Sequence, residues 1–214
     1  SEIRTPALDR LAANGVRFTQ FYNCARCCPT RASLLTGLYP HQAGVGHMVA
    51  DLGTPAYQGY LRDDCVTIAE ALGAAGYRTM MSGKWHVGGP YVLGTEWRPG
   101  APGAPLPVQR GFDEHYGTLA GAGSYFCPHA LIENDTFVEV PDDGYYYTDA
   151  ISDRAADMIG RAAGGEPFFL YVAYTAPHWP LHAWEEDISR YRGCYRGGWD
   201  ALRTARHETL KASG

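Results

Sequence analysis

The sequence predicts an α/β fold in which helices flank a mixed, largely parallel central sheet. Its 214 residues alternate helical patterns with short apolar or β-branched runs, and helices that lead into strands in this way are typical of such sheets. A hydrophobic content of 45% is that of a globular protein and argues against disorder. The longest apolar run, residues 168–173, is far shorter than the roughly 18 residues that a membrane span requires. We therefore expect one large domain, or part of one, and no membrane as a partner.

The first part of the chain carries signals for two helices and a strand. Residues 5–15 have a Thr cap, Pro at the first helical position and a terminal Gly, which predict a helix. The alternating pattern at residues 16–22 predicts a strand, and a short helix is expected at residues 30–36. Because no strand precedes the first helix, and none follows a polar helix expected at residues 199–211, we expect the fold to be incomplete at both ends.

The middle of the chain continues the alternation. Residues 67–75 predict a helix, and residues 77–82 a short strand directly after it. Residues 88–107 hold 5 Gly and 5 Pro, which predict a long surface loop. An amphipathic helix is expected at residues 147–163 and a buried apolar strand at residues 167–174.

Charge and cysteine usage narrow the classes of function. The formal net charge is −5 and the basic residues are scattered, so we expect no nucleic-acid partner. Six cysteines are an even number, but Cys24, Cys27 and Cys28 crowd one segment and the others stand alone, which does not indicate a disulfide framework. Cys24 and Cys27 form a C-x-x-C pair, but a structural zinc site needs a second pair. Neither pattern fixes the cellular compartment.

One string of fifteen residues, at positions 27–41, carries the most specific signal. It reads C-C-P-T-R-A-S-L-L-T-G-L-Y-P-H, and its C-x-P-x-R followed by A-x-L-L-T-G-x-Y-P-H resembles the signature of the type I sulfatases. In that family the first Cys of the motif is oxidised to formylglycine, and Cys27 matches that position, while Cys28 matches the variable one. Independently of the resemblance, Cys27 is expected at a helix N-terminus, which favours an anion, and Arg31 on the first turn can hold an anionic group.

A second motif follows the strand expected at residues 77–82. It reads G-K-W-H-V-G and is similar to the G-K-W-H-x-G stretch of the same family, which implies that Lys84 binds the sulfate group and that His86 assists the breakdown of the sulfated intermediate. In an extended segment Lys84 and His86 would point to the same side.

A third motif, A-P-H-W-P, follows the strand expected at residues 167–174. It resembles the family's P-H-x-P, which implies that His178 binds the leaving-group oxygen or gives it a proton. An imidazole suits that role because it titrates near neutral pH. His182, four residues later, is expected to be structural or to face the substrate.

The resemblance extends over essentially the whole chain and implies an alkaline-phosphatase-like fold. It implies that residues 1–214 are part of a sulfatase catalytic domain that lacks the first strand and the C-terminal metal-binding part. The family's ion is Ca²⁺, with Mg²⁺ as a possible substitute, and residue 27 as formylglycine is one of its ligands. The paired Asp and the Asp-Asn pair that supply the other ligands have no match in this sequence.

The activity that the resemblance implies is hydrolysis of an aryl or carbohydrate sulfate monoester. Hydrated formylglycine at position 27 attacks the sulfur while Arg31 and Lys84 hold the oxygens, His178 protonates the leaving group and His86 helps to release sulfate. The implied partners are a small sulfate ester or sulfated glycan and a formylglycine-generating maturation enzyme. A periplasmic or secreted location is a family tendency. Two alternatives remain open, namely a phosphate or phosphonate monoester hydrolase of the same superfamily and an inert fragment that binds a sulfated ligand.

Overall fold

The structure is a computed structural model that describes residues 3–90, 98–141 and 143–213. Its chain divides into two compact units, which we describe separately. The larger unit comprises Asn23–His182, and the smaller unit comprises Ser1–Tyr22 together with Ala183–Gly214. Among the described helices, none has both the length and the apolar character that crossing a membrane requires.

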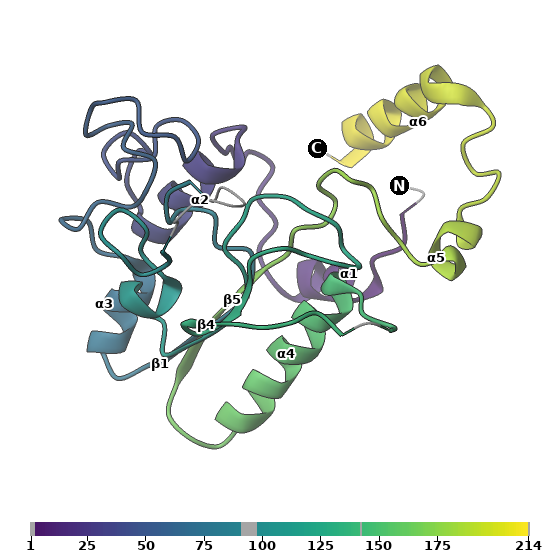
Figure 1. Ribbon diagram of the computed structural model, residues 1–214. Coiled ribbons are helices and arrows are strands. Elements are labelled where there is room, and N and C mark those ends of the chain that lie inside the picture. The colour runs from purple at the N-terminus through teal and green to yellow at the C-terminus, as the bar shows by residue number, and fades with distance from the viewer. Residues whose placement is uncertain (1–2, 91–97, 142, 214) are drawn as a thin grey trace. The chain divides into compact units, whose positions relative to one another are not determined.

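A five-stranded sheet forms the centre of the larger unit (Figure 1). Its strands lie in the order β4-β3-β2-β1-β5, with β1 parallel to both β2 and β5 and with antiparallel pairing from β2 to β3 and from β3 to β4. The strand bounds are β1 Arg78–Gly83, β2 Glu114–Thr118, β3 Leu131–Glu133, β4 Thr136–Phe137 and β5 Phe168–Ala173. The predicted α/β fold with a mixed, helix-flanked sheet is therefore confirmed, and its parallel part is the trio β2-β1-β5.

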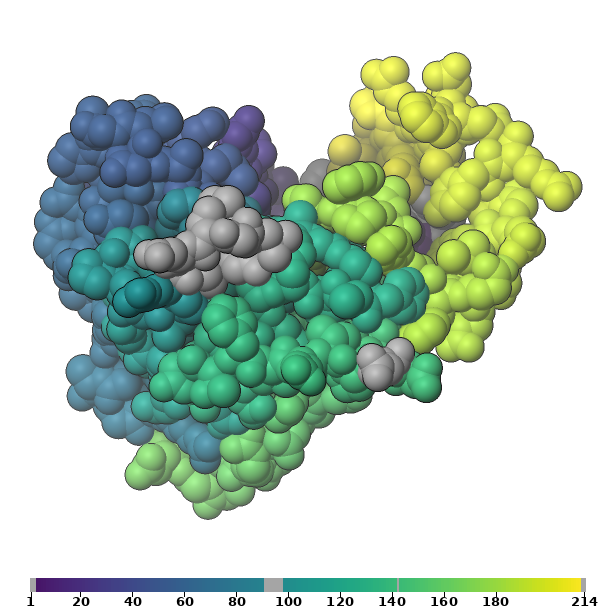
Figure 2. Space-filling model, in the orientation of Figure 1, coloured from purple at the N-terminus to yellow at the C-terminus, as the bar shows by residue number. Residues whose placement is uncertain are grey.

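Helices cover both faces of β1. Ser82 donates from Oγ to the carbonyl of Ile151 in helix α4 (Tyr147–Ala162), at 2.8 Å. Met81 points the other way, because side chains alternate along a strand, and it joins a buried cluster with Cys28 of helix α2 (Cys27–Thr36) and Ala69 of helix α3 (Ile68–Ala74). In the space-filling view, the teal and green surface of this unit comes largely from the segments between β1 and β5 (Figure 2). Cover on both faces explains why β1 is buried from Thr79 to its end.

Two glycines allow the strands to approach closely at the carboxyl end of β1. A Cβ atom on Gly83, whose φ is +123°, would lie 2.2 Å from the carbonyl oxygen of Ala173 in β5. A Cβ atom on Gly117, whose φ is +158°, would lie 1.8 Å from the carbonyl oxygen of Gly83. Only glycine fits both positions. The strand β1 therefore ends in a tightly packed glycine, and Lys84 follows directly.

The expected helices are all present, with ends that differ by a few residues. In the larger unit these are α2, α3 and α4, and in the smaller unit α1 (Pro6–Asn14) and α6 (Gly198–Ser213). The sequence did not predict β2, β3, β4, the short helix α5 (Glu185–Arg190) or the 3₁₀ turn η1 (Pro107–Arg110). Helix α3 has the Thr67–Glu70 capping box that fixes its start.

The strand predicted at residues 16–22 is wrong. These residues are exposed and form no strand, and no other strand of the described chain pairs with them. An alternating pattern forms a strand only where a neighbour accepts its hydrogen bonds, and here that neighbour is missing. None of the described residues of the smaller unit is buried.

The loop predicted at residues 88–107 is present in part. Residues 91–97 lie outside the described residues, and so does Asp142. The described remainder forms no regular helix or strand before η1 begins at Pro107. It is not wholly a surface loop, because Ala104 and Leu106 are buried.

Candidate functional site

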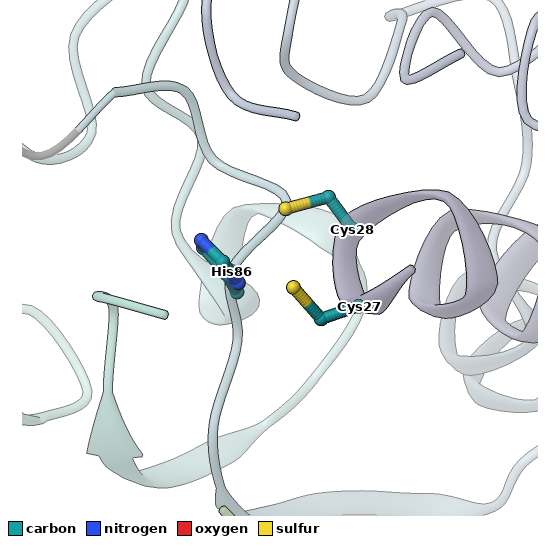
Figure 3. Close-up of side chains that lie close together, drawn as sticks. All are labelled: Cys27, Cys28 and His86. Atoms are coloured by element: carbon teal, nitrogen blue, oxygen red, sulfur yellow. The ribbon is translucent and has the colours of Figure 1, made fainter. Parts of the chain in front are cut away.

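Cys27 lies at the first position of helix α2, in the larger unit (Figure 3). The residue before it, Arg26, is extended, and the helix ends at Gly37 in a left-handed cap. The first backbone N–H groups of a helix lack partners within the helix, and they carry the positive end of its dipole. Cys27 is half-buried, and Cys28 beside it is fully buried. The sequence therefore places a reactive side chain at a helix end that favours negative charge.

The segment that follows β1 is hydrogen-bonded to both neighbouring strands, β5 and β2. The N–H of Lys84 donates to the carbonyl of Ala173 at the end of β5 at 2.8 Å, and the N–H of Trp85 donates to the carbonyl of Thr118 at the end of β2 at 2.9 Å. Trp85 is buried, and its indole Nε1 donates to the carbonyl of Pro105 at 2.8 Å. These anchors fix the positions of Lys84 and the residue after Trp85, which is His86.

Lys84 and His86 are both buried, with relative exposures of 2% and 8%. His86 adopts a left-handed backbone conformation with a φ of +58°, so the segment is not simply extended, as the sequence pattern assumed. Gly121 lies against its ring, where a Cβ atom would come within 2.0 Å of the imidazole. The His86 side chain thus occupies a slot that any larger residue at position 121 would close.

Arg31 connects helix α2 to the carboxyl ends of β1 and β5. Its guanidinium donates to the carbonyl of Lys84 at 2.5 Å, to the hydroxyl of Tyr171 at 3.3 Å and to the carbonyl of Tyr174 at 3.4 Å. All three acceptors are neutral. In the described part of the chain, neither Arg31 nor Lys84 forms an ion pair with a carboxylate. The site therefore carries positive charge that no carboxylate of the described residues compensates.

The charges at the site shift its pKa values. Burial and, to a lesser extent, the neighbouring Arg31 lower the pKa of Lys84 to about 8. Burial also lowers the pKa of His86 below its usual value. Hydrogen bonds from Cys28 and His86 lower the pKa of the Cys27 thiol, whereas the hydrogen bond to Cys27 and burial raise the pKa of Cys28. At neutral pH, Cys27 is thus the thiolate of the pair.

An open depression of about 370 Å³ adjoins Cys27. It is lined by α2, the segment before it and the ring of Tyr171 in β5, and its lining residues are Asn23, Ala25, Arg26, Cys27, Thr30, Arg31, Leu34 and Tyr171. A small anion can therefore reach Cys27 and Arg31 from solvent.

His178 is not gathered with this group. It is exposed in the loop after β5, and its Nδ1 makes a hydrogen bond of 2.6 Å with the carbonyl of Trp179. The carbonyl of His178 accepts from the Tyr125 hydroxyl at 2.7 Å. His182 accepts at Nδ1 from the N–H of Tyr125 and packs against the rings of Tyr125 and Phe126, which is a structural role. The structure thus unites Cys27, Arg31, Lys84 and His86, and leaves His178 at the surface.

Sequence reasoning missed three neighbours of this group. Cys28 was assigned to a variable position, yet its sulfur lies in a cluster with Cys27 and His86. Tyr171 bonds to Arg31, and Met48 places its Sδ 4.0 Å from the Cys27 Sγ. The register that pairs Tyr171 with Met81 places Tyr171 on the same face as α2, but a single sequence does not reveal strand register.

The side chains around Cys27 do not fit a calcium ion. Ca²⁺ prefers six to eight oxygen ligands, many of them carboxylates. The donors that lie together here are two sulfurs and one ring nitrogen, and the nearest charged groups on the described chain are the cations Lys84 and Arg31. These residues therefore do not form a calcium site.

Comparison with known proteins identifies clear relatives. The family model named Sulfatase matches residues 1–212. An uncharacterized sulfatase of Schizosaccharomyces pombe is 35% identical over the whole chain, which covers 41% of that protein. An arylsulfatase of Klebsiella aerogenes is 34% identical, again over the whole chain and 46% of that protein. The chain thus spans less than half the length of these relatives.

Solved structures give the same result for the fold. The structure of BT4656 in complex with its substrate D-glucosamine-2-N,6-O-disulfate is similar with a TM-score of 0.64 and 27% identity, over 89% of this chain and 33% of that one. The structure of Ps i-CgsB in complex with k-i-k-neocarrahexaose is similar with a TM-score of 0.61 and 32% identity, over 77% of this chain and 38% of that one.

Proposed function

The chain belongs to the sulfatase family, and from that premise we propose that it forms the nucleophile-bearing part of an enzyme that hydrolyses sulfate monoesters. One observation carries the proposal: Arg31 and the buried Lys84 lie beside Cys27 with no carboxylate to balance them in the described chain. A buried unpaired cation is costly, and proteins that keep one use it to bind an anion.

The anion in this proposal is a sulfate ester, which Arg31, Lys84 and the N-terminus of α2 would bind together. The guanidinium of Arg31 can form two parallel hydrogen bonds with sulfate oxygens, and Lys84 supplies a second positive charge. The N-terminus of α2, where Cys27 lies, adds the positive end of the helix dipole. These groups are fixed before substrate arrives, so they stabilise charge that develops on the oxygens during reaction.

The nucleophile in this proposal is Cys27 after conversion to formylglycine. A plain thiolate that attacked sulfur would form a stable thiosulfate ester, whereas the hydrated aldehyde supplies a hydroxyl that attacks and later lets sulfate leave as the carbonyl re-forms. His86 has a lowered pKa and lies against Cys27, so it is neutral at pH 7 and can take a proton from residue 27. His178 gives a proton to the leaving oxygen in this scheme, which requires its exposed loop to approach the bound substrate.

The substrate class follows from the relatives only in outline. The relatives named above include an arylsulfatase and a protein whose stated substrate is a disulfated glucosamine. We therefore propose an aryl or carbohydrate sulfate as the substrate and a formylglycine-generating enzyme as the maturation partner. A bound Ca²⁺ in the complete site would take its oxygen ligands from residues other than those around Cys27 here.

The experiment that tests the proposal is mass spectrometry of the tryptic peptide at residues 27–31, from chain co-expressed with a formylglycine-generating enzyme. We expect one cysteine to have lost its sulfur and fragmentation to place the aldehyde at Cys27. Titration of the converted chain with 4-nitrophenyl sulfate and 4-nitrophenyl phosphate then compares the two anions. If both cysteines stay thiols while a control sulfatase is converted in the same cells, the nucleophile assignment is wrong. Preference for the phosphate would instead favour a phosphate monoester hydrolase.

A further inference from the structure

Three soft donor atoms meet in the larger unit before any modification takes place. The sulfurs of Cys27 and Cys28 and a ring nitrogen of His86 all lie within 4.8 Å of one another. Figure 3 shows both sulfurs directed toward the His86 ring from the start of helix α2. Within the ranges that the structure describes, this is the one group of three or more His, Cys, Asp or Glu residues close enough to share an ion.

We propose that, while Cys27 is still a thiol, the Cys27–Cys28–His86 cluster binds one thiophilic metal ion of the Zn²⁺ class. This inference does not rest on the proposed sulfatase function, because it concerns the unconverted form of the chain. It also differs from the C-x-x-C pair of Cys24 and Cys27, which lacks the partners that a structural zinc site needs.

The geometry of the cluster is close to that of a metal site. In tetrahedral zinc sites the Zn–S and Zn–N bonds of about 2.3 and 2.0 Å place neighbouring donor atoms about 3.5–3.8 Å apart. Separations within 4.8 Å require only small side-chain rotations to reach that spacing. Three protein ligands leave a fourth position, which water can fill from the depression beside Cys27.

The donor chemistry selects the class of ion. Thiolate and imidazole ligands favour Zn²⁺ and Cu⁺ over Ca²⁺ or Mg²⁺. Met48 contributes a thioether 4.0 Å from the Cys27 sulfur, which adds to the soft character. One ring nitrogen of His86, the buried Nδ1, has no hydrogen-bond partner among the described residues, and the ring already makes a hydrogen bond with Cys27.

Two cations beside the cluster oppose the binding of a third. Lys84 acts electrostatically on both Cys27 and Cys28, and Arg31 acts on Cys28. Binding of Zn²⁺ displaces the proton that the Cys28 thiol still carries, and the two thiolates then offset the charge of the ion. We therefore expect an affinity below that of a four-ligand structural zinc site, and proton release on binding.

Metal binding has a consequence for maturation, and this consequence, unlike the binding itself, rests on the proposed function. The ion would be bound to the sulfur of Cys27, which is the atom that must be removed to form formylglycine. Metal binding and conversion are thus mutually exclusive at this residue, and a chain loaded with zinc would resist conversion.

Titration of the reduced, unconverted chain with Co²⁺ tests the proposal without any measurement of enzyme activity. We expect one Co²⁺ per chain, a sulfur-to-cobalt charge-transfer absorption, and displacement of Co²⁺ by Zn²⁺. Cys28→Ser should remove this absorption and weaken Zn²⁺ binding at least tenfold. Cys127→Ser and Cys194→Ser are the matched controls, since both residues are exposed, and they should bind as the unmodified chain does. Equal binding by Cys28→Ser would overturn the proposal.

A protection measurement keeps the test valid if Cys28→Ser fails to fold. The unmodified chain is treated with iodoacetamide with and without Zn²⁺, and the peptide at residues 27–31 is fragmented to locate the label. We expect Zn²⁺ to slow labelling of Cys27 at least tenfold while labelling of Cys127 is unchanged. Equal labelling of Cys27 in both samples would refute the site regardless of the variants.

Discussion

Strands β1 and β5 run parallel and end at the same edge of the sheet, but the residues that follow them have opposite surroundings. Lys84 and His86, after β1, are 2% and 8% exposed, whereas His178, after β5, lies at the surface. Strand β1 has a neighbour on each side and a helix on each face, whereas β5 is an edge strand whose side chains are mostly only half-buried. The interior position is what shifts the pKa values of Lys84 and His86, because the shifts arise mainly from burial. The proposed site residues Lys84 and His86 thus follow the interior strand β1, and the proposed proton donor His178 follows the edge strand β5.

The largest effect is expected from Lys84→Met, which removes the buried charge and keeps the length of the side chain. Binding of 4-nitrophenyl sulfate to the chain, measured by calorimetry, should weaken at least tenfold. The thermal midpoint should rise, because the folded state no longer desolvates an unpaired cation. Lys211→Met is the matched control, since Lys211 is exposed and paired with Glu208, and it should change neither quantity. Unchanged sulfate binding by Lys84→Met would show that the buried charge after β1 does not bind the anion.

The lowered pKa of Lys84 predicts that both sulfate binding and the free energy of unfolding depend on pH. Its pKa in the folded chain is about 8, below the usual 10.5, so sulfate binding should weaken as pH rises through about 8. Between about pH 8 and 10.5 the unfolded chain holds more protons than the folded one, so the free energy of unfolding should gain from Lys84 as pH rises. Urea unfolding of the unmodified chain and of Lys84→Met measures this gain. The stability difference between them should shrink toward pH 10.5, and a constant difference would contradict the burial argument.

Replacing each histidine by alanine sharpens the contrast between the two strand ends. His86→Ala empties a packed slot beside Gly121, so it should lower stability by about 1–3 kcal/mol, whereas His178→Ala at the surface should stay within about 0.5 kcal/mol. In formylglycine-bearing chain, His178→Ala should slow esters with poor leaving groups more than 4-nitrophenyl sulfate, because only the former need a proton donor. An equal effect on both esters would remove His178 from that role.

The smallest effect is expected from Tyr171→Phe. It deletes one of the three acceptors of Arg31, and the carbonyls of Lys84 and Tyr174 remain. The loss should be about 0.5–1.5 kcal/mol of unfolding free energy, the usual net worth of one hydrogen bond. Sulfate binding should fall by less than tenfold, measured against Tyr22→Phe as an exposed control. A larger loss than that of Lys84→Met would show that the position of Arg31, and not the charge of Lys84, limits binding.

Local sequence patterns predicted the helices and strands that depend mainly on residues close together in the chain. The Thr, Pro and Gly signals at residues 5–15, the amphipathic period of α4 and the apolar run of β5 each predicted an element that the structure contains. The resemblance of two motifs to those of a known family singled out Cys27, Arg31, Lys84 and His86, which the fold brings together. The pattern at residues 16–22 failed because a strand depends on a partner elsewhere. The roles of Cys28 and Tyr171 were not predictable, since both follow from side-chain direction and strand register in the folded chain.

The hydrogen bonds of Arg31 also determine when the site can form during synthesis. Its three acceptors lie 53, 140 and 143 residues further along the chain. Contacts of such long sequence separation form late, because the intervening chain must first be ordered. A nascent chain therefore cannot complete the anion-binding group until Tyr174 has been made, although Cys27 was added almost 150 residues earlier.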